Sequence, residues 1–318
     1  MARKPVVVVL HADVLPSGMD AVAAVADVRY ATADTLAENL SGADVLLVWD
    51  FFSTALRTAW SEADSLRWVH VAAAGVDSLL FDELVESDVL VTNSRGVFDR
   101  PIAEFVLATI LGFAKDVSTS VRLQDTKQWR HRETESIAGT SVLVVGTGAI
   151  GRETARLLTA VGMQVAGSGR VGADADADFG VVHASSDLKS VVEEFDYVVL
   201  LAPLTAATRG MVDAGVLAAM KSTARLVNVG RGELVVTDDL VEALQTRSIA
   251  GAALDVFDTE PLPADHPLWQ LDSVVITPHM SGDAVGWRDR LAELFVANFE
   301  RYVGGKELAN IVDKTRGY

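Results

Sequence analysis

The sequence reads Ser141-Val-Leu-Val-Val-Gly-Thr-Gly-Ala-Ile-Gly151 near the middle of its 318 residues. The apolar run 141–145 is typical of a buried parallel strand, and a helical pattern follows the glycines at once. Gly146 allows a tight turn, Gly148 lets a pyrophosphate approach the backbone, and Gly151 lets the helix lie close to the strand. The stretch therefore predicts dinucleotide binding; the alternative is a glycine-rich turn that binds nothing.

The end of the next predicted strand indicates which dinucleotide is preferred. Ser168 occupies the position where an NAD-binding unit usually carries a carboxylate for the ribose 2′-hydroxyl, and Arg170 follows two residues later. A hydroxyl beside a guanidinium suits a 2′-phosphate, which a carboxylate would repel. NADP(H) is therefore favoured over NAD(H), although Asp174, Asp176 and Asp178 would oppose the phosphate if they fold inward.

Short apolar runs alternate with helical patterns on both sides of this motif, as in parallel βαβ units. The predicted strands are Val6–Leu10, Val28–Tyr30, Val45–Val48, Trp68–Val71, Val89–Val91, Ser141–Val145, Gln164–Ala166, Tyr197–Leu201, Arg225–Val229, Ile249–Leu254 and Val274–Ile276. The clearest helical patterns cover residues 19–26, 35–40, 81–85, 102–123, 152–161 and 287–302.

Two domains follow from this alternation and from the length of the chain. Residues 1–100 and 283–318 are expected to form one domain, which binds substrate, and residues 101–282 an inserted dinucleotide-binding domain. The long helix 102–123 would carry the chain across. The acidic run Ala173–Asp178 is expected to be a solvated loop.

The composition narrows the class of protein. Lysine plus arginine number 27 against 44 aspartate plus glutamate, a net charge of −17, which disfavours nucleic acid and anionic membranes as partners. With no cysteine, disulfides, thiolate metal sites and a cysteine nucleophile are excluded. No run is long enough for a membrane span, so a cytoplasmic location is the default expectation. An anionic substrate would need a local positive charge, and no metal site is expected.

Three ionisable residues follow predicted strands of the second domain, at the edge where open α/β sheets hold ligands. They are Arg231, Glu260 and His279. Each has an ordinary alternative: Arg231 pairing with Glu233 or Asp255, Glu260 solvated, and His279 a loop histidine. Together they supply a carboxylate clamp, an acid and a group that orients the acid, which suits reduction of a 2-oxo acid.

Several longer stretches resemble the D-2-hydroxyacid dehydrogenase family, in the right order over nearly the whole chain. They are Ala73-Ala-Gly-Val-Asp77, Pro101-Ile-Ala-Glu104, Gly146–Gly151, Leu200-Leu-Ala-Pro-Leu-Thr205 with Thr208, Val227–Val235, Gly251–Pro263 and Ile276-Thr-Pro-His279. The resemblance implies an α/β fold of two doubly wound domains, a Rossmann domain inserted into a flavodoxin-like one.

The resemblance also implies roles for single residues. Arg231 would bind the substrate carboxylate, and His279 would protonate the carbonyl oxygen as hydride arrives from the nicotinamide. Glu260 would hydrogen-bond the other ring nitrogen of His279. Backbone N–H groups of Gly75 and Val76 would bind the carboxylate from the first domain. The implied cofactor contacts are Gly146, Gly148, Ala149, Ile150, Gly151, Ser168, Arg170, Ala202, Pro203, Thr208, Val229, Gly230, Asp255, His279 and Ser281.

The substrate is expected to be a small anionic 2-oxo acid. Trp49 ends the third predicted strand; the residue either reaches the substrate or packs in the core. With Ala74–Ser78 and the non-acidic Ser168, it resembles the glyoxylate/hydroxypyruvate reductase branch. The alternatives are a nucleotide-sensing protein of the same fold and a phosphite-oxidising relative. A homodimer is also implied, with the helix from Ile102 in the interface.

Overall fold

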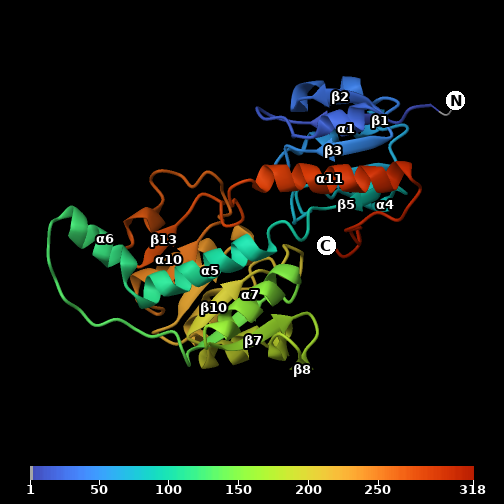
Figure 1. The fold of residues 1–318 in the computed structure, drawn as a ribbon. Helices are drawn as coiled ribbons and strands as arrows, with labels where there is room; N and C mark the ends of the chain where they lie inside the picture. Colours follow the sequence, from blue (N-terminus) through green and yellow to red (C-terminus); the bar gives the residue numbers. More distant parts are fainter. Residues whose placement is uncertain (1–2) are drawn as a thin grey trace. The chain divides into compact units, whose positions relative to one another are not determined.

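The computed structural model describes residues 3–318 (Figure 1). The chain divides into two compact units, one formed by residues up to Phe98 together with Ala284–Tyr318 and the other by Asp99–Asp283. Each unit has a parallel or mostly parallel sheet covered by helices, so the predicted α/β class with two doubly wound domains is confirmed.

The first unit has a five-stranded sheet in the order β2-β1-β3-β4-β5, with every pair parallel. This is the flavodoxin-like strand order. Its elements are β1 (Val6–Leu10), α1 (Met19–Ala23), β2 (Asp27–Ala31), α2 (Leu36–Leu40), β3 (Val45–Val48), α3 (Ala55–Ala59), β4 (Trp68–Val71), α4 (Asp82–Glu86), β5 (Leu90–Thr92) and α11 (Trp287–Val303). The central strands β1, β3 and β4 are buried throughout, as continuous runs of β-branched and other apolar residues predict.

The long helix α11, which lies near the C-terminus in the sequence, covers the sheet of the first unit (Figure 1). Trp68 on β4 stacks on Phe295 with a centroid separation of 5.5 Å, and it contacts the tilted ring of Tyr302 at 5.4 Å. The C-terminal segment continues past α11 and pairs with the edge strand, because Val312 N–H donates to the carbonyl of Val91 at 2.9 Å. The sequence does not signal this last pairing.

The second unit has eight strands in the order β13-β12-β11-β10-β6-β7-β9-β8. Its elements are α5 (Asp99–Ala114), α6 (Val117–Asp125), β6 (Ser141–Val145), α7 (Ala149–Ala160), β7 (Gln164–Gly169), β8 (Ala173–Asp176), β9 (Gly180–Ala184), α8 (Leu188–Val191), β10 (Tyr197–Leu200), α9 (Ala214–Ala219), β11 (Arg225–Asn228), α10 (Thr237–Gln245), β12 (Gly251–Leu254) and β13 (Val274–Ile276). The run β9-β7-β6-β10-β11-β12 is the Rossmann order, and its direction of winding reverses between β6 and β10, where such sheets bind dinucleotides.

Two local expectations are wrong. The acidic run Ala173–Asp178 is not a loop: its first part forms β8, which pairs antiparallel with β9. Arg152 on α7 bonds to both Asp176 and Asp178 at 2.9 Å. These ion pairs stabilise the hairpin, which has no run of apolar residues from which a strand could be predicted. The predicted helix 102–123 is two helices, because Asp116 adopts a left-handed conformation with φ 49° and ends the first.

Candidate active site

The glycine loop has the shape that a dinucleotide requires. Gly146 has a φ of 117°, and a side chain on it would lie 2.5 Å from the Leu201 backbone. A side chain on Gly151 would lie 1.9 Å from the Gly146 carbonyl oxygen, so the start of α7 touches the loop. Around a Cβ on Gly148, by contrast, 4 Å of space is open. The loop and the N-terminus of α7, which begins at Ala149 and Ile150, therefore fit a pyrophosphate.

The second expected cofactor position differs from its prediction. The hydroxyl of Ser168 is buried and has no hydrogen-bond partner among the described residues, since strand alternation turns it into the domain. Gly169, the next residue, faces the loop instead: a Cβ there would lie 2.8 Å from the Thr147 hydroxyl. The side chain of Arg170 is exposed. Ser168 is therefore not oriented to bind a 2′-phosphate in this conformation.

The acidic residues that follow Arg170 are largely neutralised by arginines. The guanidinium of Arg152 binds both carboxylate oxygens of Asp176 at 2.9 Å and one of Asp178 at 2.9 Å. These bonds, with backbone N–H donors, lower the pKa of Asp176 to about 2. Arg156 adds a contact of 3.3 Å to Asp178. The negative charges of Asp176 and Asp178, two of the three aspartates expected to oppose NADP(H), are thus compensated by these arginines.

The turn after β10 lies next to the glycine loop. Thr208 donates its hydroxyl proton to the Pro203 carbonyl at 2.6 Å and accepts from the Thr205 N–H at 2.8 Å, which closes the turn. Ala202 borders the loop, since a Cβ on Gly146 would lie 2.6 Å from its nitrogen. Thr208 therefore stabilises this turn with its hydroxyl group.

The turn after β11 carries Arg231. Asn228 accepts from the Gly230 N–H at 3.1 Å and donates to the Arg231 carbonyl at 2.8 Å, so the side chain of the last strand residue bridges the turn. Val229 is buried. Gly232 allows close packing, because a Cβ there would lie 1.9 Å from the Phe257 backbone. The guanidinium of Arg231 also donates to the Gly230 carbonyl at 2.8 Å. The backbone that carries this side chain is therefore held in place by the turn.

The side chains of His279 and Glu260 are close enough to form an ion pair. His279 Nδ1 lies 2.8 Å from Glu260 Oε2, and the Phe257 N–H donates to Glu260 Oε1 at 2.9 Å, so both carboxylate oxygens are held. Burial disfavours the charged form of Glu260, but the bonds from His279 and Phe257 and the charge of Arg231 outweigh it, and the pKa of Glu260 is lowered. The carboxylate is therefore ionised beside the imidazole.

The loop that carries His279 is organised by Asp255. This buried carboxylate accepts from the Thr277 hydroxyl at 2.5 Å, the Met280 N–H at 2.9 Å and the Ser281 N–H at 2.8 Å. His279 itself has a φ of 51°, and its N–H donates to the Asp255 carbonyl at 2.8 Å. Sequence reasoning expected Asp255 and Ser281 at the cofactor; it missed that Asp255 supports the histidine loop.

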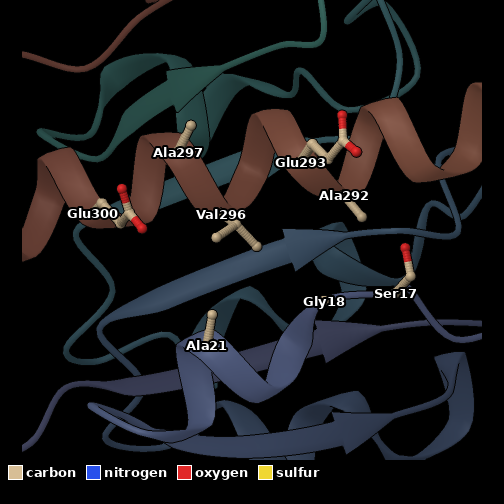
Figure 2. A pocket seen from close by; sticks show the side chains of 8 residues that line it. All are labelled: Ser17, Gly18, Ala21, Ala292, Glu293, Val296, Ala297 and Glu300. Carbon is tan, nitrogen blue, oxygen red and sulfur yellow. The ribbon is translucent and has the colours of Figure 1, made fainter.

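The first unit holds the remaining expected residues. Trp49 is buried, with 7 % of its surface exposed. Gly75 and Val76 lie in the turn after β4, and within residues 3–318 neither of their N–H groups has a hydrogen-bond partner. A hollow of about 340 Å³ lies between α1 and α11, and none of the expected site residues lines it (Figure 2).

A glycine loop at the switch point of the sheet, together with a paired histidine and glutamate and an arginine after neighbouring strands, is typical of a dinucleotide-dependent oxidoreductase. The family comparison specifies it further. Residues 107–281 match the model described as D-isomer specific 2-hydroxyacid dehydrogenase, NAD binding domain. The chain belongs to this family and is an NAD(P)-dependent 2-hydroxyacid dehydrogenase that acts on the CH–OH group of donors.

Individual relatives agree with this family. A glyoxylate reductase from Thermofilum pendens is 31% identical over 263 residues, 79% of this chain and 76% of its own. A protein of the proB 3′ region of Corynebacterium melassecola is 35% identical over 293 residues, 88% and 92% of the two chains. The NADPH-dependent glyoxylate/hydroxypyruvate reductase of Sinorhizobium meliloti, solved with NADP and sulfate, superimposes with a TM-score of 0.82 at 27% identity, covering 99% and 100%. Among the described residues, no helix is long and apolar enough to span a membrane.

Proposed function

We propose that this enzyme reduces a small 2-oxo acid, of the glyoxylate or hydroxypyruvate type, to the D-2-hydroxy acid. The observation that carries the proposal is the 2.8 Å contact between His279 Nδ1 and an ionised Glu260, because a carboxylate that orients an imidazole is the arrangement expected of a general acid. The glyoxylate reductases among the relatives support the substrate class.

The residues of this chain have distinct tasks in the proposed reaction. Arg231 binds the substrate carboxylate with its guanidinium fork, which supplies the positive charge that an acidic protein needs for an anionic substrate. The N–H groups of Gly75 and Val76 supply further donors to that carboxylate. His279 gives its proton to the carbonyl oxygen, and Glu260 holds the ring in orientation.

The cofactor supplies the hydride that the carbonyl carbon receives, so that proton and hydride together give the hydroxy acid. Residues of the Gly146–Gly151 loop and the N-terminus of α7 would hold its pyrophosphate. We propose NADP(H) as the preferred cofactor, with Arg170 as the 2′-phosphate ligand. An exposed guanidinium, the absence of an acidic side chain at Gly169 and the pairing of Asp176 and Asp178 with Arg152 support this preference.

Oxidation of NADPH and NADH by the purified enzyme tests the proposal, with glyoxylate, hydroxypyruvate, pyruvate and phenylpyruvate as substrates. We expect a higher kcat/KM with NADPH and with the two smallest acids. Faster turnover with NADH would reject the preference based on Arg170 but keep the catalytic assignment. Nucleotide binding without turnover of any 2-oxo acid would favour the sensing protein, and phosphite oxidation would favour the phosphite-oxidising branch.

A further inference from the structure

Two consecutive residues, Asn93 and Ser94, hold the turn after β4 in place. Asn93 Nδ2 donates to the Ala74 carbonyl at 2.7 Å, and the Ser94 N–H donates to the Ala73 carbonyl at 2.8 Å. The Ser94 hydroxyl donates to the Val71 carbonyl at 3.0 Å. Two carbonyls of this turn and the last carbonyl of β4 therefore accept hydrogen bonds from these two residues.

The bond from Asn93 determines the direction of a donor on the other side of the turn. The Ala74 carbonyl and the Gly75 N–H belong to one planar trans peptide, so they point in opposite directions. Fixing the oxygen therefore fixes the hydrogen. A rotation of this peptide would replace the Gly75 N–H by a carbonyl oxygen, which repels a carboxylate.

Asn93 is itself held firmly. It is 7 % exposed, and its Oδ1 accepts from the Arg95 N–H at 3.3 Å. Asn310, in the C-terminal segment, accepts from the Asn93 N–H at 3.2 Å through its carbonyl. Its side-chain amide donates to the carbonyls of Arg95 at 2.8 Å and Asn93 at 3.3 Å. The last residues of the chain thus clamp the backbone that presents the Asn93 side chain.

A buried polar chain supports the neighbouring serine. Trp68 Nε1 donates to the Thr92 hydroxyl at 2.8 Å, and that hydroxyl lies 2.7 Å from His70 Nδ1. His70 Nε2 lies 3.3 Å from the Ser94 hydroxyl, which is already committed as a donor to Val71. The buried polar groups on this side of the turn hydrogen-bond to one another, and this network holds Ser94 and the adjacent Asn93 in a single conformation.

We propose that Asn93 is a positioning residue for the substrate carboxylate, and that Asn310 fixes Asn93 from the C-terminal segment. Asn93 acts through the Ala74–Gly75 peptide, whose N–H it directs, without touching the substrate. The proposal rests on the proposed function, because it takes the Gly75 N–H to be a ligand of the carboxylate. Through Asn310, the C-terminal segment would therefore contribute to the affinity for the substrate.

The variant Asn93→Asp tests this with almost no change in shape. It keeps the oxygen that accepts from Arg95 and replaces the donor to Ala74 by a second oxygen. We expect the KM for the 2-oxo acid to rise about tenfold or more, the effect of losing one hydrogen bond to a charged group. The kcat and the KM for NADPH should change less than about twofold, because the lost binding is uniform across ground and transition states.

Two further variants complete the comparison. Asn310→Ala should raise the same KM by a smaller factor, since it loosens Asn93 without removing its donor, and it keeps the test valid if Asn93→Asp fails to fold. Asn39→Asp is the matched control: Asn39 Nδ2 also donates to a backbone carbonyl, of Thr35 at 2.9 Å, but on the exposed surface of α2. Its kinetic constants should equal those of the wild type.

Binding of oxamate, a non-reactive analogue, to the NADPH complex separates this proposal from the proposed function. Oxamate binding about tenfold weaker in Asn93→Asp than in the wild type supports the positioning role even if no tested 2-oxo acid turns over. Equal affinities, no oxamate binding by the wild type, or a loss of thermal stability with unchanged KM would each overturn it. A wild type that binds oxamate but reduces none of the acids would reject only the proposed function.

Discussion

At the scale of single residues, the pairing of His279 with Glu260 makes the sharpest prediction. Glu260→Gln keeps the shape and the bond to Phe257 N–H but removes the charge beside the imidazole. We expect the limb of the pH–rate profile that reports His279 to move to lower pH, because an amide does not stabilise the imidazolium. Stopped-flow reduction rates between pH 5 and about pH 9 measure it. An unmoved limb would show that the pairing does not control the acid.

The buried histidine of the first unit has a different pH dependence. Burial lowers the pKa of His70 to about 3, whereas the unfolded chain has the ordinary value of 6.5. Between these values the unfolded state binds the additional proton, so the free energy of unfolding falls as the pH falls through this window. The contribution approaches about 1.4 kcal/mol per pH unit.

Urea titrations of the wild type and of His70→Asn at several pH values from 7 to about 4 measure this contribution. The variant is less stable at pH 7, because it loses ring contacts with Phe295, but its stability should decline less on acidification. The exposed His131→Asn is the control and should follow the wild type. Parallel curves for His70→Asn and the wild type would contradict the prediction.

At the scale of elements, the contact of α7 with the strand before it depends on Gly151. Gly151→Ala places a Cβ 1.9 Å from the Gly146 carbonyl oxygen, which the helix can relieve only by moving away from the loop. We expect a loss of about 1–3 kcal/mol in stability and NADPH binding at least about tenfold weaker.

The neighbouring Gly148→Ala is the matched control for stability, because its Cβ would meet no atom within 4 Å. It should leave the melting temperature unchanged while still weakening NADPH, since the added methyl obstructs the close approach of the pyrophosphate. Differential scanning fluorimetry with and without NADPH separates the two effects. An equal fall in melting temperature for both variants would show that the helix contact is not what Gly151 provides.

At the scale of the whole molecule, the proposed homodimer can be tested on the exposed face of α6. Val117 and Val121 lie one turn apart on this helix and are 49 % and 53 % exposed. We expect light scattering to give about twice the chain mass of 33.9 kDa, and Val121→Asp to shift the population toward the monomer. Val161→Asp, at another exposed valine of the same unit, should leave the mass unchanged. A wild-type mass of one chain would reject the homodimer.

Local patterns in the sequence were enough for most strands. Val6–Leu10, Val45–Val48 and Ser141–Val145 have the predicted bounds, because buried parallel strands require unbroken apolar runs. The acidic strand β8 was missed because its stability comes from the ion pairs with Arg152, which lies 24 residues before Asp176. Such partners cannot be recognised by periodicity.

The sequence alone determined the α/β class and the glycine loop after β6, and it led to the proposed roles of Arg231, Glu260 and His279, because these features depend on neighbouring residues. Only the tertiary structure decided that the Ser168 hydroxyl faces inward, that Asp255 supports the histidine loop and that Asn310 clamps Asn93. Asn310 and Asn93 are separated by 217 positions. Hydrogen bonds over such separations form only when the chain has folded, so no local pattern encodes them.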